Sequence, residues 1–202
     1  AYGRGSTAAL SNMLPTSVRF FWFLGIAIAT VGYVVTPDLV LLLFGKKYEG
    51  AIIAVQASLC VGGLGLFVAP INSYQTTADL QSDRLWITCG TLLVNAVVAG
   101  LCIPQWGLGG ALISISVTGF AYCLFAVIAL RRRRGISPPF TTMTRLLLSG
   151  GAALAVGAEV KAILGLKFGF VPAAGAVLLV YLALSVATRC WTKQDFLLLR
   201  SI

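Results

Sequence analysis

The fold is decided by one uncharged stretch, residues 85–130, which reads LWITCGTLLVNAVVAGLCIPQWGLGGALISISVTGFAYCLFAVIAL. A membrane-spanning helix needs about 20 mostly apolar residues. The 46 residues of this stretch are therefore too many for one spanning helix and suit two. Pro104 and Gly107 lie near its middle and favour a break, and Trp106 between them suits the membrane–water interface. We predict a helical hairpin that turns at residues 104–107.

The composition of the whole chain agrees with a membrane protein. Of 202 residues, 58% are hydrophobic and only 10% are charged, whereas soluble domains carry about 25% charged residues. The mean hydropathy is +0.94. A net charge of +9 would suit nucleic acid, but the basic residues separate long apolar runs, as topology signals do. Most of the surface is expected to face lipid, and no nucleic-acid partner is expected.

The chemistry-bearing residues are few. Histidine is absent, which removes the commonest general base and metal ligand. The five cysteines have no C-x-x-C spacing, and four of them lie in apolar runs. We therefore expect no catalytic residue, no metal site, no cofactor and no enzyme. The sequence begins without Met and with a polar segment, so we expect a piece of a longer protein.

Charged residues divide the chain into six apolar windows. Pro37 is expected to end the first window, which leaves residues 39–44 as a short interfacial piece. Residues 1–135 would hold four transmembrane helices, and residues 136–202 a linker, an extra hairpin and a cytoplasmic tail. Glu159 and Lys161 interrupt the fifth window; they do not share a helix face, and each is expected to reach the surface alone. The predicted spans are approximately 18–36, 50–74, 85–104, 108–130, 146–164 and 168–188.

Lysine and arginine predict the orientation, because short cytoplasmic loops carry the excess of positive charge. Six spans place both ends of the chain on one side. Eleven of the 15 basic residues fall on that side and four on the other. We therefore predict a multi-pass protein of the inner (plasma) membrane with both termini of this chain in the cytoplasm. The eleven are Arg4, Arg19, Arg84, Arg131, Arg132, Arg133, Arg134, Arg145, Arg189, Lys193 and Arg200.

Two segments resemble the polysaccharide flippases of the multidrug/oligosaccharidyl-lipid/polysaccharide exporter superfamily. Residues 42–51, LLFGKKYEGA, are similar to that family's llfG-x-x-Y-x-x-A segment. Asn95 followed by residues 101–111, LCIPQWGLGGA, resembles its N…lip-x-x-G-x-x-G-a-A hairpin, although Leu112 stands where a second small residue is common. The four arginines at 131–134 complete the likeness, which covers roughly residues 18–135.

The resemblance implies a fold and a function. Family members have fourteen helices in two six-helix lobes and an extra pair, and this chain resembles helices nine to fourteen. The missing N-terminal helices of the same protein would then be its partner, because alternating access needs two lobes. The cargo would be a lipid-linked oligosaccharide or polysaccharide precursor, of the polyprenyl-pyrophosphate type, used in lipopolysaccharide and other cell-envelope glycans.

Two groups of residues are candidates for a site. Asn72, Tyr74, Gln75 and Asn95 could line a polar groove for sugar hydroxyls. The alternative for the first three is an interfacial helix end, and for Asn95 it is packing between helices. Arg131, Arg132, Arg133 and Arg134 could contact anionic membrane lipids or a carrier pyrophosphate, or could act only as an orientation signal.

Two other functions remain open. A drug/cation antiporter of the same superfamily would use intramembrane carboxylates for ion coupling, and the centres of the six windows have none. A membrane-embedded glycan polymerase or glycosyltransferase would call for histidine, paired carboxylates or a large outer loop. The sequence therefore favours the flippase.

Overall fold

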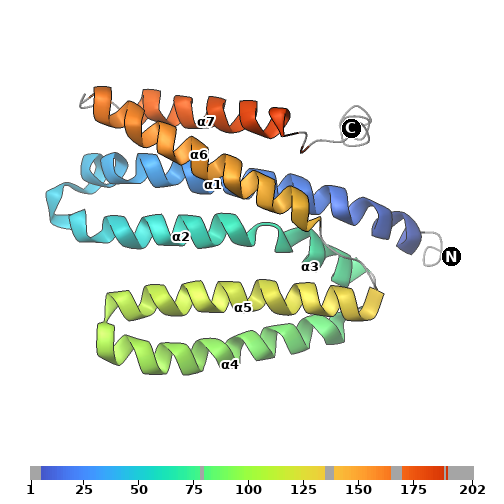
Figure 1. Cartoon of the computed structure of the whole chain (residues 1–202). Helices are drawn as coiled ribbons and strands as arrows, with labels where there is room; N and C mark the ends of the chain where they lie inside the picture. Colours follow the sequence, from blue (N-terminus) through green and yellow to red (C-terminus); the bar gives the residue numbers. More distant parts are fainter. Residues whose placement is uncertain (1–5, 78–79, 135–138, 165–169, 189, 191–202) are drawn as a thin grey trace. The chain divides into compact units, whose positions relative to one another are not determined.

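The computed structural model describes residues 6–77, 80–134, 139–164, 170–188 and 190. Over these residues the chain forms seven α-helices and one short 3₁₀ helix, and no strand. Figure 1 shows them in chain order. They are α1 Ser6–Phe44, η1 Lys46–Ala51, α2 Ile52–Gly65, α3 Val68–Thr77, α4 Gln81–Trp106, α5 Leu108–Arg134, α6 Phe140–Leu164 and α7 Phe170–Ala187.

Six helical segments in the described part are long and apolar enough to cross a membrane. Large apolar side chains point outward along them, including Leu148 at 75% exposure and Leu92 at 69%. Such surfaces are stable only against lipid or other apolar groups. The prediction of an all-α, multi-pass membrane protein is confirmed. The spans are Met13–Phe44, Lys46–Gly65, Gln81–Trp106, Leu108–Arg132, Phe140–Ile163 and Phe170–Ala187.

One compact unit contains residues 1–25 and 61–139 and is built around the antiparallel hairpin of α4 and α5 (Figure 1). The predicted turn is confirmed at Gly107, whose φ of +52° is a left-handed value that suits glycine. Gly110 lies so close to the carbonyl of Cys102 that a Cβ there would overlap the backbone. Pro104 was expected to break the helix, but α4 continues through it to Trp106. The turn therefore depends on Gly107.

The second predicted span is interrupted. Residues 50–74 were expected to form one helix, but α2 ends at Gly65 and α3 begins at Val68. Pro70 explains the break, because its ring clashes with the carbonyl four residues earlier and its nitrogen has no hydrogen to donate. That carbonyl, on Leu66, instead accepts from the Ala69 N–H at 3.0 Å. Trp22 of α1 packs edge-on against Phe67 in the break, with ring centroids 5.0 Å apart.

The other compact unit contains residues 26–60 and 140–202. Helices α6 and α7 lie antiparallel in it (Figure 1). One face of α7 is fully buried, with Ala173, Val177, Tyr181 and Ser185 spaced four residues apart. Gly157 of α6 lies against Val177, where a Cβ would leave no room. Small residues thus allow these helices to pack closely, as is typical inside a membrane.

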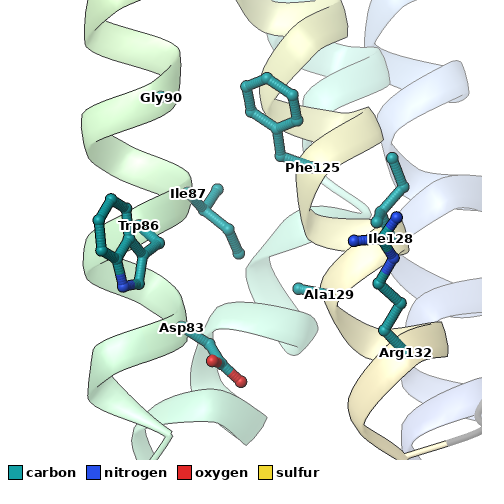
Figure 2. A pocket seen from close by; sticks show the side chains of 8 residues that line it. All are labelled: Asp83, Trp86, Ile87, Gly90, Phe125, Ile128, Ala129 and Arg132. Carbon is teal, nitrogen blue, oxygen red and sulfur yellow. The ribbon is translucent and has the colours of Figure 1, made fainter.

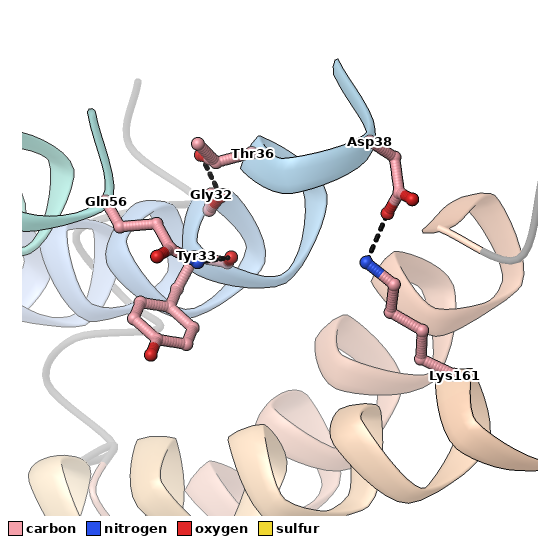
Figure 3. A network of polar contacts seen from close by, with 6 residues as sticks. All are labelled: Gly32, Tyr33, Thr36, Asp38, Gln56 and Lys161. Atoms are coloured by element: carbon pink, nitrogen blue, oxygen red, sulfur yellow. Dashed lines mark hydrogen bonds and ion pairs between the residues drawn. The ribbon is translucent and has the colours of Figure 1, made fainter. Parts of the chain in front are cut away.

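Helix α1 corrects the prediction for Pro37. Instead of ending there, the helix continues to Phe44, so residues 39–44 are helical and not a separate interfacial piece. Pro37 has no N–H for the carbonyl of Tyr33, four residues earlier. The Gln56 side chain of α2 supplies the missing donor at 2.9 Å, as Figure 3 shows. Neighbouring side chains that satisfy a freed carbonyl let proline remain inside membrane helices.

Two further helices begin earlier than expected. Helix α4 begins at Gln81 instead of 85, and α6 at Phe140 instead of 146. The first turns of α4 include Asp83 and Arg84, and those of α6 include Arg145. The charges marked the edge of the apolar window and not the end of the helix, because a helix continues into the headgroup layer.

Candidate functional site

The polar segment of α3 is tied to both helices of the hairpin. The Tyr122 hydroxyl of α5 donates a hydrogen bond to Asn72 Oδ1 at 2.9 Å. Arg84 of α4 donates from Nη1 to Thr76 Oγ1 at 3.0 Å. The predicted groove residue Asn72 is therefore half-buried and bonded across helices.

Tyr74 and Gln75 are the most deeply placed members of the candidate groove, each only 3% exposed. Gln75 Oε1 is buried and accepts no hydrogen bond. An unsatisfied buried acceptor destabilises a fold by about 1–3 kcal/mol. The described residues supply no donor to this oxygen.

Asn95 lies apart from the other candidates. It is half-buried and only about 2 Å along the axis from the midpoint of α4, which places it near mid-membrane. The backbone of Gln75 instead bonds to Leu80, directly before α4 begins. About 21 Å of helix separates Asn95 from Gln81 at that beginning. The structure therefore groups Asn72, Tyr74 and Gln75 on α3, and it does not bring Asn95 to them.

A pocket of about 340 Å³ opens between α4 and α5. Figure 2 shows Asp83 at one end of this pocket, Phe125 and Gly90 toward the other, and the Arg132 side chain reaching to the level of Ile128. Asp83 is 9% exposed, while Arg132 is exposed. The remaining lining residues are Trp86, Ile87, Ile128 and Ala129. This pocket was not predicted from the sequence, because Asp83 and Arg132 are far apart in the chain.

The arginine cluster at the end of α5 is only partly described. Arg131 and Arg132 are exposed, whereas the side chains of Arg133 and Arg134 lie outside the described residues. Of the cluster, Arg132 lines the pocket.

The unit that contains α6 and α7 holds an ion pair that the sequence analysis did not find. Lys161 of α6 pairs with Asp38 of α1 (Figure 3). The two side chains are 33% and 28% exposed. Lys161 was expected to reach the surface alone, and this was wrong because α1 continues past Pro37 and carries Asp38 to it. The signal in the sequence that could have indicated this pair was Asp38, an isolated acidic residue directly after Pro37.

No protein-family model, curated protein or solved structure matches this chain. Within the described residues, no three His, Cys, Asp or Glu side chains gather as metal ligands. The candidate features therefore come from the geometry of this chain alone. One unit holds the polar helix α3 after a broken span and the pocket between α4 and α5, and the other unit holds the ion pair of Asp38 and Lys161.

Proposed function

We propose that this chain is part of a flippase that moves a lipid-linked oligosaccharide or polysaccharide precursor across the plasma membrane by alternating access. The observation that carries the proposal is the break between α2 and α3 within an apolar region. Transporters commonly form substrate sites where spanning helices are interrupted by Gly or Pro. Here glycines precede the break and Pro70 follows it. The polar segment comes directly after the break.

The polar segment suits a sugar better than an ion. Asn72 and Gln75 offer amide groups that both donate and accept, as sugar hydroxyls do. Gln75 Oε1 has an unused acceptor position, and Tyr74 supplies an aromatic ring beside it in the sequence. Asn95, near mid-membrane, would be a later contact along the same path. In this proposal the cargo leaves chemically unchanged, so no catalytic residue or cofactor takes part.

The arginines at 131–134 would lie on the cytoplasmic side, together with both ends of this chain. There they would contact anionic lipid headgroups or the pyrophosphate of the polyprenyl carrier. The remaining helices of the same protein would complete the second lobe that alternating access requires.

The second candidate is a drug/cation antiporter of the same superfamily, and Asp38 is the observation that favours it. The windows predicted from the sequence had no central carboxylate, but the longer α1 adds Asp38 near one end of a spanning segment, about 14 Å from its midpoint. If the protein is an antiporter that uses the Asp38 carboxylate, the Asp38→Asn variant should lose ion-driven drug efflux. A flippase would keep glycan export in that variant, apart from any loss of protein.

The experiment uses cells whose surface polysaccharide depends on the protein that contains this chain. Gln75→Leu and Asn95→Leu should reduce surface polysaccharide while membrane abundance stays normal, since leucine suits the bilayer and removes only the polar group. Ser73→Ala is the matched control, because Ser73 is exposed on the same helix and bonds to the Ala69 carbonyl. Wild-type export in the Gln75→Leu/Asn95→Leu double variant would refute the proposed path. Loss of abundance in step with export would identify these residues as packing contacts.

A further inference from the structure

The segment at which α1 ends and η1 begins exposes a cluster of large apolar side chains. We call residues 42–49 of this segment the α1 tip. Leu43 is 64% exposed, Phe44 60% and Tyr48 50%. The rings of Phe44 and Tyr48 lie together, with centroids 5.7 Å apart. The proposed transport path does not use this surface, so the tip needs another explanation.

The α1 tip also carries charges that no other described residue neutralises. Lys46 and Lys47 are both exposed, and neither forms an ion pair within the described part of the chain. Glu49 is exposed as well. Two lysines and one glutamate give the tip a net charge of +1. The apolar cluster is thus joined to a surface that attracts anions.

The backbone holds this surface in a defined turn. Gly45 has a φ of +76°, a left-handed value that suits glycine. Its N–H donates to the carbonyl of Leu41 at 3.0 Å, and the Tyr48 N–H donates to the Gly45 carbonyl at 3.2 Å. Lys46 and Lys47 lie between these two bonds, so an ordered turn presents their side chains.

The position of the α1 tip along its helix places it among lipid headgroups. Asp38 and Lys161 lie about 14 Å from the midpoints of their spans, near the boundary of the hydrocarbon core. Phe44 follows Asp38 by six residues on the same helix, which adds about 9 Å along the axis. The headgroup layer on each side of a bilayer is about 5–8 Å thick. Lipid phosphates therefore surround the tip.

We propose that the α1 tip binds an anionic phospholipid, such as phosphatidylglycerol, in the leaflet that it reaches. The ammonium groups of Lys46 and Lys47 donate hydrogen bonds to the lipid phosphate. The glycerol backbone and the start of an acyl chain lie on Leu43 and Phe44, at a depth where aromatic rings are favourable. This inference stands apart from the proposed transport function and does not depend on the cargo.

The charge of the α1 tip sets a preference among lipids. A zwitterionic headgroup, as in phosphatidylcholine, brings a cation of its own toward the lysines, whereas phosphatidylglycerol brings only the phosphate. Each basic residue near an anionic lipid surface strengthens binding about fivefold, and an acidic residue weakens it by a similar factor. With a net charge of +1, the tip should prefer phosphatidylglycerol to phosphatidylcholine about fivefold.

Photocrosslinking of the protein that contains this chain, reconstituted into liposomes, tests the preference at the tip itself. Trace amounts of phosphatidylglycerol or phosphatidylcholine, each with a photoreactive group at the start of the acyl chain, are added to identical liposomes. Mass spectrometry of peptides measures the yield on residues 42–53. The ratio of the two yields should be about five for the wild-type protein. The same ratio on α7, which contains no charged residue, is the internal control and should not change among variants.

Three exposed side chains allow the ratio to be shifted in both directions. Lys46→Gln and Lys47→Gln should each bring it close to one, because each removes the net charge. Glu49→Gln should instead raise it to about 25. A general disturbance of the turn would lower the ratio in all three variants, so the opposite shift in Glu49→Gln separates charge from structure.

Three results would overturn the proposal. The first is equal yields of the two lipids on residues 42–53 of the wild-type protein, which needs no variant. The second is a ratio that does not change in Lys46→Gln and Lys47→Gln. The third is the absence of crosslinks from either lipid on these residues while α7 is labelled, which would show that water or another protein covers the tip.

Discussion

The ion pair between Asp38 and Lys161 should stabilise the unit formed by residues 26–60 and 140–202. Both residues lie about 14 Å along the axis from the midpoints of their spans, near the boundary of the hydrocarbon core. Exposed ion pairs contribute about 0–1 kcal/mol, and removing one partner of a buried pair costs about 3–5 kcal/mol. At 33% and 28% exposure this pair lies between the two cases. We expect Asp38→Asn to destabilise the protein by about 1–2 kcal/mol.

A double-mutant cycle isolates that contribution. Asp38→Asn and Lys161→Gln should each lower the thermal unfolding midpoint in detergent by about 3–6 °C. The double variant should lie close to either single variant, because its loss includes the same interaction only once. Glu159→Gln is the control, since Glu159 is exposed on the same helix, and it should change the midpoint little. Additive losses in the double variant would refute the coupling, and a loss in Glu159→Gln as large as in Lys161→Gln would point to general charge effects.

Three other predictions follow from the helix contacts and the proposed topology. Gly110→Ala should destabilise the hairpin by about 1–3 kcal/mol, because the added Cβ would overlap the Cys102 carbonyl. The control Gly109→Ala has ordinary room for its Cβ, and equal thermal midpoints of the two variants would contradict the close contact at Gly110. Gln56→Leu should destabilise the protein by about 1–2 kcal/mol, because it leaves the Tyr33 carbonyl without its donor, and unfolding measurements that match the wild type would show that the bond contributes nothing. In a background without native cysteines, Lys46→Cys and Arg131→Cys should react with an impermeant thiol reagent from opposite sides of the membrane; labelling from the same side would reject the six-span topology.

The sequence predicts the α4–α5 hairpin well because its signals are local. The length of the uncharged stretch sets two helices, and Gly107 adopts the positive φ that the turn requires. Nothing in that prediction depends on a distant residue.

The errors have the opposite cause. Pro37 ends a helix when the carbonyl that it leaves free finds no other donor, but here Gln56, 23 positions from Tyr33, donates to the Tyr33 carbonyl. The partner of Lys161 is Asp38, 123 positions away. The spacing between Lys161 and Glu159 therefore carried no information about this ion pair. The Asn72–Tyr122 bond and the two charges of the pocket are also long-range pairs. Local pattern predicts most of the helices of this chain, whereas contacts between helices decide whether Pro37 ends α1 and which polar groups come together.

Translocation by the purified protein that contains this chain tests the proposed flippase function. It is reconstituted into liposomes whose lipid-linked oligosaccharide carries a fluorophore on the sugar, and an impermeant quencher is added from outside. Protein-free liposomes should lose only the outer-leaflet fluorescence, about half of the total, because a charged or sugar headgroup does not cross the hydrocarbon unaided. Quenching should become nearly complete with the wild-type protein and should slow in Gln75→Leu/Asn95→Leu. Quenching that stops at the protein-free level, with the protein folded and inserted, would contradict the flippase assignment.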